Sequence, residues 1–264
     1  MRVALCQIEV GDDPAANLKT MLDAIAAAGD ADLAVFPEAA QIRFGNDLAA
    51  AAEPLDGPFT TALAQAAREH GTAVIAGMFE PADDGRVHNT VVAIDTDGTL
   101  AGSYRKIHLF DAFGFAESDA MAPGTEPLVV ELAGARVGLI TCYDIRFPEL
   151  ARVLVDRGAE MLVVTAAWAQ GPFKEEHWVT LVRARAIENT CWTLAADKAP
   201  DTTRPPAGGR TGVGRSLAVD PMGAVQADLG PAPAVRVVDV DLARTAEVRA
   251  VLPSLRHRRP DLLG

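Results

Sequence analysis

Three residues that lie far apart in the sequence could carry out nucleophilic chemistry together: Glu38, Lys106 and Cys142. A carboxylate can take the thiol proton as a general base. An ammonium group favours the thiolate and can stabilise the oxyanion of a tetrahedral intermediate. If the three side chains converge on one pocket, they can transfer an acyl group through a thioester without a histidine.

Cys142 occupies a position that suits a reactive thiol. The apolar residues before it predict a strand over 136–141, and Pro148 fits the first turn of a helix over 147–157. The thiol would then lie at the carboxyl end of a strand and beside a helix N-terminus, where open α/β sheets bind ligands. A single cysteine is more often a small buried apolar residue, so its role depends on a base and an oxyanion stabiliser elsewhere in the chain.

The other two candidates also follow predicted strands. Glu38 comes just after a short strand over 33–36. Lys106 comes just after a hairpin of strands over 88–94 and 99–105, whose Asp-Gly turn is a strong signal. Each side chain taken alone could be an ordinary surface residue. Their chemical use therefore depends on a fold that brings these strand ends together.

The elements that must position these residues occur twice. Residues 2–105 and 136–230 each predict the same order of strand, helix, strand, helix, strand and hairpin. The strands are nearly continuous apolar runs, which is typical of sheets that are covered on both faces. We therefore expect an α/β fold of two similar halves, with the sheets face to face and the helices outside. The predicted helices cover 14–28, 59–70, 147–157 and 173–188.

The chain organisation predicts a single domain over residues 1–264, since no linker rich in Pro, Gly or Ser separates the halves. Residues 199–211, rich in Pro, Gly, Asp and Thr, predict a surface loop. The helix over 173–188 carries Trp178, Leu181, Val182 and Ile187. These are more apolar residues than one sheet face needs, which favours a homodimer or a larger even assembly, although the same face could pack on its own sheet.

Composition limits the classes of partner. The chain has 24 basic and 36 acidic residues and a net charge of −12, which argues against nucleic acid or an anionic membrane as the main partner. No apolar run approaches the ~18 residues of a membrane span, and the N-terminal segment lacks the features of a signal peptide. Three widely spaced cysteines fit a reducing cytoplasm. The sequence contains no His-Glu-x-x-His or Cys-x-x-Cys motif, so we expect no metal and no cofactor.

Three segments resemble the nitrilase superfamily of carbon–nitrogen hydrolases. They are Phe36-Pro37-Glu38, the segment from Tyr104 to Leu109 around Lys106, and the segment from Thr141 to Glu149 around Cys142. Their order and spacing agree with the family, and the resemblance covers nearly the whole chain. It implies a four-layer αββα sandwich of the nitrilase type, which pairs into αββα–αββα dimers. It also implies a Glu38–Lys106–Cys142 triad.

The resemblance adds a second glutamate, Glu117, in the loop after the lysine motif. It is most similar to the Nit-type branch, whose members cleave terminal amides of small carboxylates and include ω-amidases and deaminated-glutathione amidases. The implied substrates are a small amide and water. The segment 111–114 differs from the branch members, so the identity of the substrate stays open. The candidate substrate-binding residues are Tyr143, Arg146, Trp168 and Arg43, with the two arginines as candidate carboxylate anchors.

Glu38 and Glu117 are expected to play different roles, because two carboxylates beside one ammonium group cannot both be free bases of equal strength. We expect Glu38 to be the general base and Glu117 to hold Lys106. Two other activities, nitrile hydrolysis and hydrolysis of N-carbamoyl amino acids, would use the same triad. A catalytically inactive scaffold protein is a third alternative, which an assay of ammonia release distinguishes.

Overall fold

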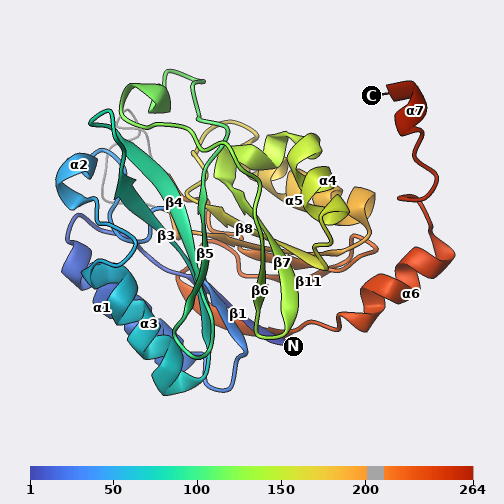
Figure 1. Ribbon diagram of the computed structural model, residues 1–264, viewed down its shortest axis with the longest axis horizontal. Coiled ribbons are helices and arrows are strands. Elements are labelled where there is room, and N and C mark those ends of the chain that lie inside the picture. The colour runs from blue at the N-terminus through green and yellow to red at the C-terminus, as the bar shows by residue number, and fades with distance from the viewer. Residues whose placement is uncertain (201–210, 264) are drawn as a thin grey trace.

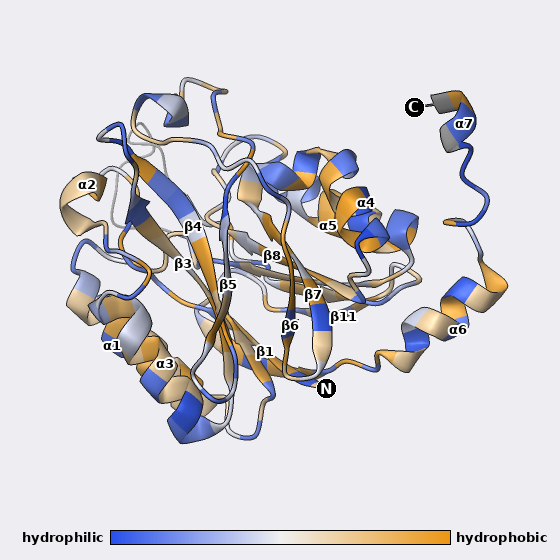
Figure 2. Cartoon of the chain, viewed as in Figure 1, coloured by the Kyte–Doolittle hydropathy of each residue, from blue (hydrophilic) through white to orange (hydrophobic). Residues whose placement is uncertain are grey.

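Two six-stranded sheets lie face to face between two layers of helices in the computed structural model, which describes residues 1–200 and 211–263 (Figure 1). This four-layer arrangement confirms the predicted αββα sandwich. Hydrophobic residues concentrate on the strands of the two sheets, which lie between the helix layers (Figure 2). The helices are α1 (Pro14–Ala27), α2 (Leu48–Ala51), α3 (Pro58–His70), α4 (Pro148–Asp156), α5 (Lys174–Asn189), α6 (Ala243–Val251) and α7 (Pro260–Leu263).

The first sheet combines the first half of the chain with one strand from near its end. Its spatial order is β12 (Ala234–Asp239), β1 (Arg2–Gln7), β2 (Leu33–Val35), β3 (Ala73–Pro81), β4 (Val87–Ile94) and β5 (Leu100–Arg105). In β1, Val3 and Leu5 join the core between the sheets, whereas Ala4 and Cys6 pack in the core under α1 and α3. Both faces are therefore buried, which explains why the strands are continuous apolar runs.

The second sheet has the spatial order β11 (Val225–Asp228), β10 (Leu217–Val219), β9 (Trp192–Asp197), β8 (Met161–Ala166), β7 (Ala135–Thr141) and β6 (Val129–Leu132). Helices α4 and α5 cover its outer face (Figure 1). Trp178 and Val182 of α5, which the sequence offered for a dimer face, are fully buried in this core. Ile187 is 46% exposed. The alternative that this face packs on its own sheet therefore holds for the tryptophan and the valine.

The two halves correspond strand by strand, as the repeated order of elements predicted. Strands β1, β2 and β3 pair in parallel and continue into an antiparallel hairpin, and β7, β8 and β9 do the same. Each sheet then gains a sixth strand that the sequence did not reveal. Strand β6 pairs antiparallel with β7, and β12 pairs antiparallel with β1. Only β12 comes from the opposite end of the chain.

Local signals in the sequence set the helix boundaries. The Asp13 carboxylate accepts a hydrogen bond from the Ala15 N–H at 2.9 Å and caps α1, with Pro14 at the first helical position. Gly71 ends α3 in the left-handed conformation at φ 64°. The predicted and observed helices therefore agree to within about two residues at each end.

The chain beyond β12 leaves the sandwich, and α6 and α7 lie beside it (Figure 1). Arg258 in this segment forms an ion pair with Asp156 at the end of α4, at 2.7 Å. The predicted loop over 199–211 falls mainly on residues outside the described part of the chain. Across residues 1–200 and 211–263, no helix has the length and the apolar character that a membrane crossing requires.

Candidate active site

The predicted reactive residues meet at one cavity between the two halves. Glu38 follows β2, Cys142 follows β7, and Glu117 lies in a short 3₁₀ helix over Glu117–Asp119. All three line a cavity of about 540 Å³, and Lys106, just after β5, contacts two of them. The carboxyl ends of strands from both sheets thus build one site, as expected for ligand sites in α/β folds.

The Glu38 carboxylate is held by three donors and is only 1% exposed. Its Oε1 accepts hydrogen bonds from Asn89 Nδ2 at 2.7 Å and Lys106 Nζ at 3.0 Å, and its Oε2 accepts one from the Ala167 N–H at 2.8 Å. The turn that carries Glu38 packs directly on Gly77 of β3. A Cβ at residue 77 would lie 2.7 Å from Glu38 Cα, so only glycine lets the turn approach this closely.

Lys106 is a fully enclosed ammonium group between two carboxylates. Its Nζ donates to Glu38 Oε1 at 3.0 Å and to the two carboxylate oxygens of Glu117 at 3.0 and 2.8 Å. Burial alone would lower the pKa of Lys106, but the charges of Glu38 and Glu117 outweigh it and hold the pKa well above its usual value. Lys106 therefore stays positively charged at neutral pH.

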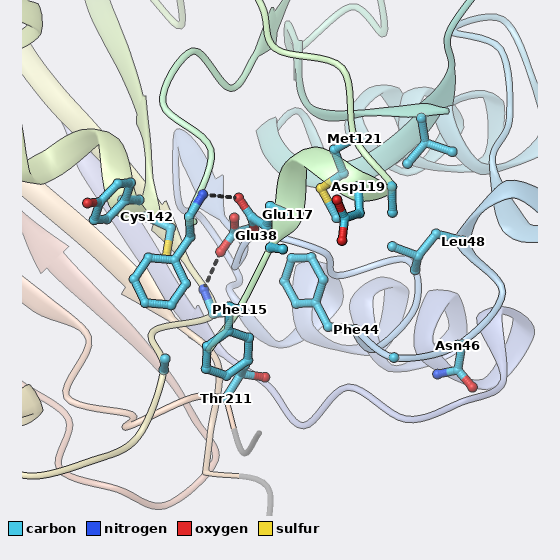
Figure 3. A pocket seen from close by; sticks show the side chains of 18 of the residues that line it. Glu38, Phe44, Asn46, Leu48, Phe115, Glu117, Asp119, Met121, Cys142 and Thr211 are labelled. Carbon is cyan, nitrogen blue, oxygen red and sulfur yellow. Dashed lines mark hydrogen bonds between the residues drawn. The ribbon is translucent and has the colours of Figure 1, made fainter. Parts of the chain in front are cut away.

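Glu117 is tied to Lys106 and to the loop that precedes it. Its Oε2 also accepts a hydrogen bond from the Phe110 N–H at 2.7 Å. Burial, with a further contribution from Glu38, raises the pKa of Glu117, while Lys106 opposes this rise. The hydrogen bonds drawn in Figure 3 end on the carboxylates of Glu38 and Glu117, which lie side by side next to Cys142.

Cys142 begins a 3₁₀ helix (Cys142–Arg146) in the left-handed region at φ 47°. A non-glycine residue there carries backbone strain and is typical of functional turns. Asp144 anchors the turn, because its carboxylate accepts hydrogen bonds from the Thr141 N–H at 3.1 Å and from the Tyr104 hydroxyl at 2.6 Å. Burial and the charge of Glu38 raise the pKa of the Cys142 thiol well above its usual value, against an opposing effect of Lys106. The resting thiol is therefore protonated and needs a base.

The other two cysteines lie away from Glu38 and Lys106. Cys6 lies within β1 and Cys191 just before β9, and both are fully buried outside the cavity. Burial raises the pKa of each thiol to about 12. Neither thiol is placed to react with a ligand of the cavity.

The predicted substrate-binding residues separate into two groups. Tyr143 and Trp168 line the cavity. Arg146 and Arg43 do not line the cavity itself but lie next to residues that do, and their role as carboxylate anchors stays a prediction. The Arg146 guanidinium lies over the Trp168 ring, 4.9 Å from its centroid. The Arg43 guanidinium forms an ion pair with Asp12.

Two features of the cavity were not foreseen from the sequence. Lys174, the first residue of α5, lines the cavity close to Trp168. On the side away from Cys142, an apolar cluster lines the cavity next to Asp119 and Asn46 (Figure 3). It is formed by Phe44, Leu48, Val87 and Met121. Within the described residues, no group of three or more His, Cys, Asp or Glu side chains could hold a metal ion.

Comparison with known proteins gives one consistent family. Residues 2–250 match the family model described as carbon-nitrogen hydrolase. The chain is 46% identical to the hydrolase Rv0480c of Mycobacterium tuberculosis over 98% of this chain and 95% of that protein. It is 39% identical to a deaminated glutathione amidase of Escherichia coli O157:H7, with 94% of each chain covered.

The chain is also similar to solved structures of amidases. An amidase from Nesterenkonia sp. AN1 aligns with a TM-score of 0.82 and 28% identity over 99% of this chain and 95% of the other. In that structure, a Glu-to-Gln mutant shows covalent addition of the acetamide moiety of fluoroacetamide at the active-site cysteine.

Proposed function

The chain belongs to the carbon–nitrogen hydrolase family of the nitrilase superfamily, and on that premise we propose that it is an amidase for small amides that also carry a carboxylate. The products are the free carboxylic acid and ammonia. The observation that carries this proposal is the contact of one buried ammonium group, Lys106, with both Glu38 and Glu117 beside Cys142. This arrangement supplies a nucleophile, a base and an oxyanion stabiliser in one cavity.

The first half of the reaction forms a thioester. Glu38 accepts the proton of Cys142 as Sγ attacks the amide carbon, and the carbonyl oxygen becomes an oxyanion near the Lys106 ammonium group. The tetrahedral intermediate then collapses, the C–N bond breaks, and Glu38 returns the proton to the leaving ammonia. The raised pKa of Cys142 supports this order, because a protonated thiol must lose its proton during the attack.

The second half consumes water. A water molecule gives a proton to a carboxylate of the site and attacks the thioester carbon, and the carboxylic acid leaves as Sγ recovers a proton. Glu117 holds the Lys106 ammonium group through both of its oxygens, and we assign it the supporting role of polarising the substrate or this water.

We also propose that the protein acts as a homodimer or a larger even assembly in the cytoplasm. Half-exposed apolar side chains support the assembly: Ile187 of α5 is 46% exposed, Met222 is 50% exposed, and Val251 of α6 is 81% exposed. The three cysteines are free and buried, which suits a reducing compartment. Sedimentation at micromolar concentration tests the assembly, and a monomer would contradict it.

A panel of amides, nitriles and N-carbamoyl amino acids, scored by kcat/KM for ammonia release, tests the reaction. We expect amides with a carboxylate at the other end to give the highest values. The Cys142→Ala variant is the matched control for any contaminating activity. A clear preference for nitriles or for carbamoyl compounds would overturn the amidase proposal and leave the family assignment intact.

A further inference from the structure

Lys174 is a buried cation with an unusual set of neighbours. Its side chain is 5% exposed, and its Nζ lies 4.1 Å from the ring centroid of Phe113, 4.9 Å from that of Phe110 and 5.6 Å from that of Trp168. Within residues 1–200 and 211–263, no carboxylate pairs with this ammonium group and no oxygen accepts a hydrogen bond from it. The ammonium group therefore lies among three aromatic rings, and its nitrogen is still open to the cavity that Lys174 lines.

The charges around Lys174 favour the binding of an anion. Burial lowers the pKa of Lys174, and the nearby Arg146 lowers it further. The Arg146 guanidinium lies over the same Trp168 ring, 4.9 Å from its centroid, so two cations flank one indole. Buried charges in proteins are normally paired. An anionic ligand group here would relieve both the cost of burial and the repulsion from Arg146.

We propose that Lys174 binds the carboxylate of the substrate and thereby determines the preference for carboxylate-bearing amides. This inference rests on the proposed amidase function. Lys174 and Cys142 line the same cavity, and a charge on the Cys142 sulfur is near enough to affect the pKa of Lys174. One molecule can therefore present its amide carbon to Cys142 and its carboxylate to Lys174.

The residues that line the cavity between Cys142 and Lys174 determine which spacer can join the amide to the carboxylate. Phe110 and Tyr143 contact each other edge to face, with ring centroids 5.0 Å apart, and both line the cavity. Apolar walls favour methylene groups between the amide and the carboxylate. The walls thus suit an amide whose carboxylate is joined to it by an apolar spacer. Phe113, in the segment that departs from the family pattern, is 76% exposed and forms the outermost wall around Lys174.

The location of the cation matters because the other charged residues that line the cavity are acidic, apart from Arg86. The chain has a net charge of −12, and Glu38, Glu117, Asp47 and Asp119 line the cavity. A carboxylate is repelled from that side and attracted to the side of Lys174 and Arg146. The orientation of the substrate follows from this asymmetry, with the amide toward the glutamates and the carboxylate toward α5.

The test compares succinamate with butyramide, a neutral amide of the same chain length, in wild type and Lys174→Met. We expect kcat/KM for succinamate to fall about 10- to 100-fold, the range for a lost hydrogen bond between charged groups. The loss should lie mainly in KM, because the contact exists in both the ground state and the transition state. Butyramide should lose far less, and Lys174→Arg should recover part of the succinamate activity. Lys19→Met, at an exposed lysine, is the control for net charge.

Calorimetric titration of succinamate into Cys142→Ala, with and without Lys174→Met, decides the point independently of turnover. A Kd raised about tenfold or more by Lys174→Met supports the inference. An unchanged Kd overturns it, as does an equal loss of kcat/KM for both amides. If wild type releases no ammonia from any amide, the proposed function fails, and the titration still reports on Lys174.

Discussion

The two walls of the cavity each hold a buried lysine, but only one of these lysines is paired with carboxylates. The first wall consists of Glu38, Lys106 and Glu117, and every charge on it contacts an opposite charge. The second wall consists of Cys142, Trp168 and Lys174, and its ammonium group lies among aromatic rings without an ion pair to any described carboxylate. Both lysines are almost completely buried. The charge of Lys106 is compensated by Glu38 and Glu117, and these residues serve the proposed chemistry. The charge of Lys174 is the one that we propose for binding the ligand.

The largest expected effect comes from removing the nucleophile of the second wall. Cys142→Ala should lower kcat by more than about 10⁴-fold, because no other group of the site can form the thioester. The melting temperature should stay close to that of wild type, since alanine occupies less space and the same backbone conformation. Circular dichroism and ammonia release measure the two quantities.

Cys191→Ala is the matched control for Cys142→Ala, because Cys191 is buried but lies outside the cavity. It should lose stability and keep its turnover. If alkylation of Cys191 abolished activity while Cys142 remained unmodified, the assignment of the nucleophile would be wrong.

The next effect comes from the base of the first wall. Glu38→Gln should lower kcat by about 10²- to 10⁴-fold, the usual contribution of a general base. The amide keeps an oxygen for Lys106 but cannot take the thiol proton. Mass spectrometry after mixing with substrate should therefore show no acyl-enzyme.

Glu117→Gln should have a smaller effect and a different signature. The Lys106 ammonium group keeps its contact with Glu38, so acylation should continue while hydrolysis of the thioester slows. The acyl-enzyme should then accumulate and be visible by mass spectrometry. An acyl-enzyme trapped in Glu38→Gln and never in Glu117→Gln would mean that the two carboxylates have the reverse roles.

The smallest expected effect is a pH dependence of stability. The raised pKa of the Cys142 thiol means that the folded protein holds this proton more tightly than the unfolded chain does. Its contribution is complete below the ordinary thiol pKa of about 9 and is lost as the pH rises above that value. The loss amounts to at most about 1.4 kcal/mol per pH unit. In urea unfolding, wild type should therefore lose stability relative to Cys142→Ala as the pH rises above about 9, and parallel profiles would contradict the raised pKa.

The sequence was a good guide to the first wall and to Cys142, and a poor one to Lys174. Glu38, Lys106 and Cys142 stand after predicted strands, which are local features, and Glu117 followed from the family resemblance. Lys174 precedes Glu175 and Glu176, and this pattern is typical of a solvated helix start. The rings that enclose it come from a distant loop, so no local pattern reveals its burial.

The surroundings of Arg43 and the pairing of strand β12 also depend on contacts between segments that are distant in the sequence. Arg43 is close to Glu38 in sequence, but the chain turns at Ala39 with φ 53° and the guanidinium meets Asp12 instead. The residues of β12 are at most partly buried, unlike those of the central strands. Their pairing with β1 depends on a contact between opposite ends of the chain. Such contacts leave little trace in local composition.

Strand β12 makes the fold of the first sheet depend on a segment that is synthesised after all the other strands of both sheets. The second sheet can assemble as soon as β6 to β11 have left the ribosome, because these strands are contiguous in sequence. The first sheet has to wait for Ala234–Asp239, and until then β1 presents an unpaired edge. A chain truncated before Ala234 would contain every residue of the cavity and still expose a template for aggregation. Integrity of the first sheet is therefore tied to a segment that is synthesised after every residue of the cavity.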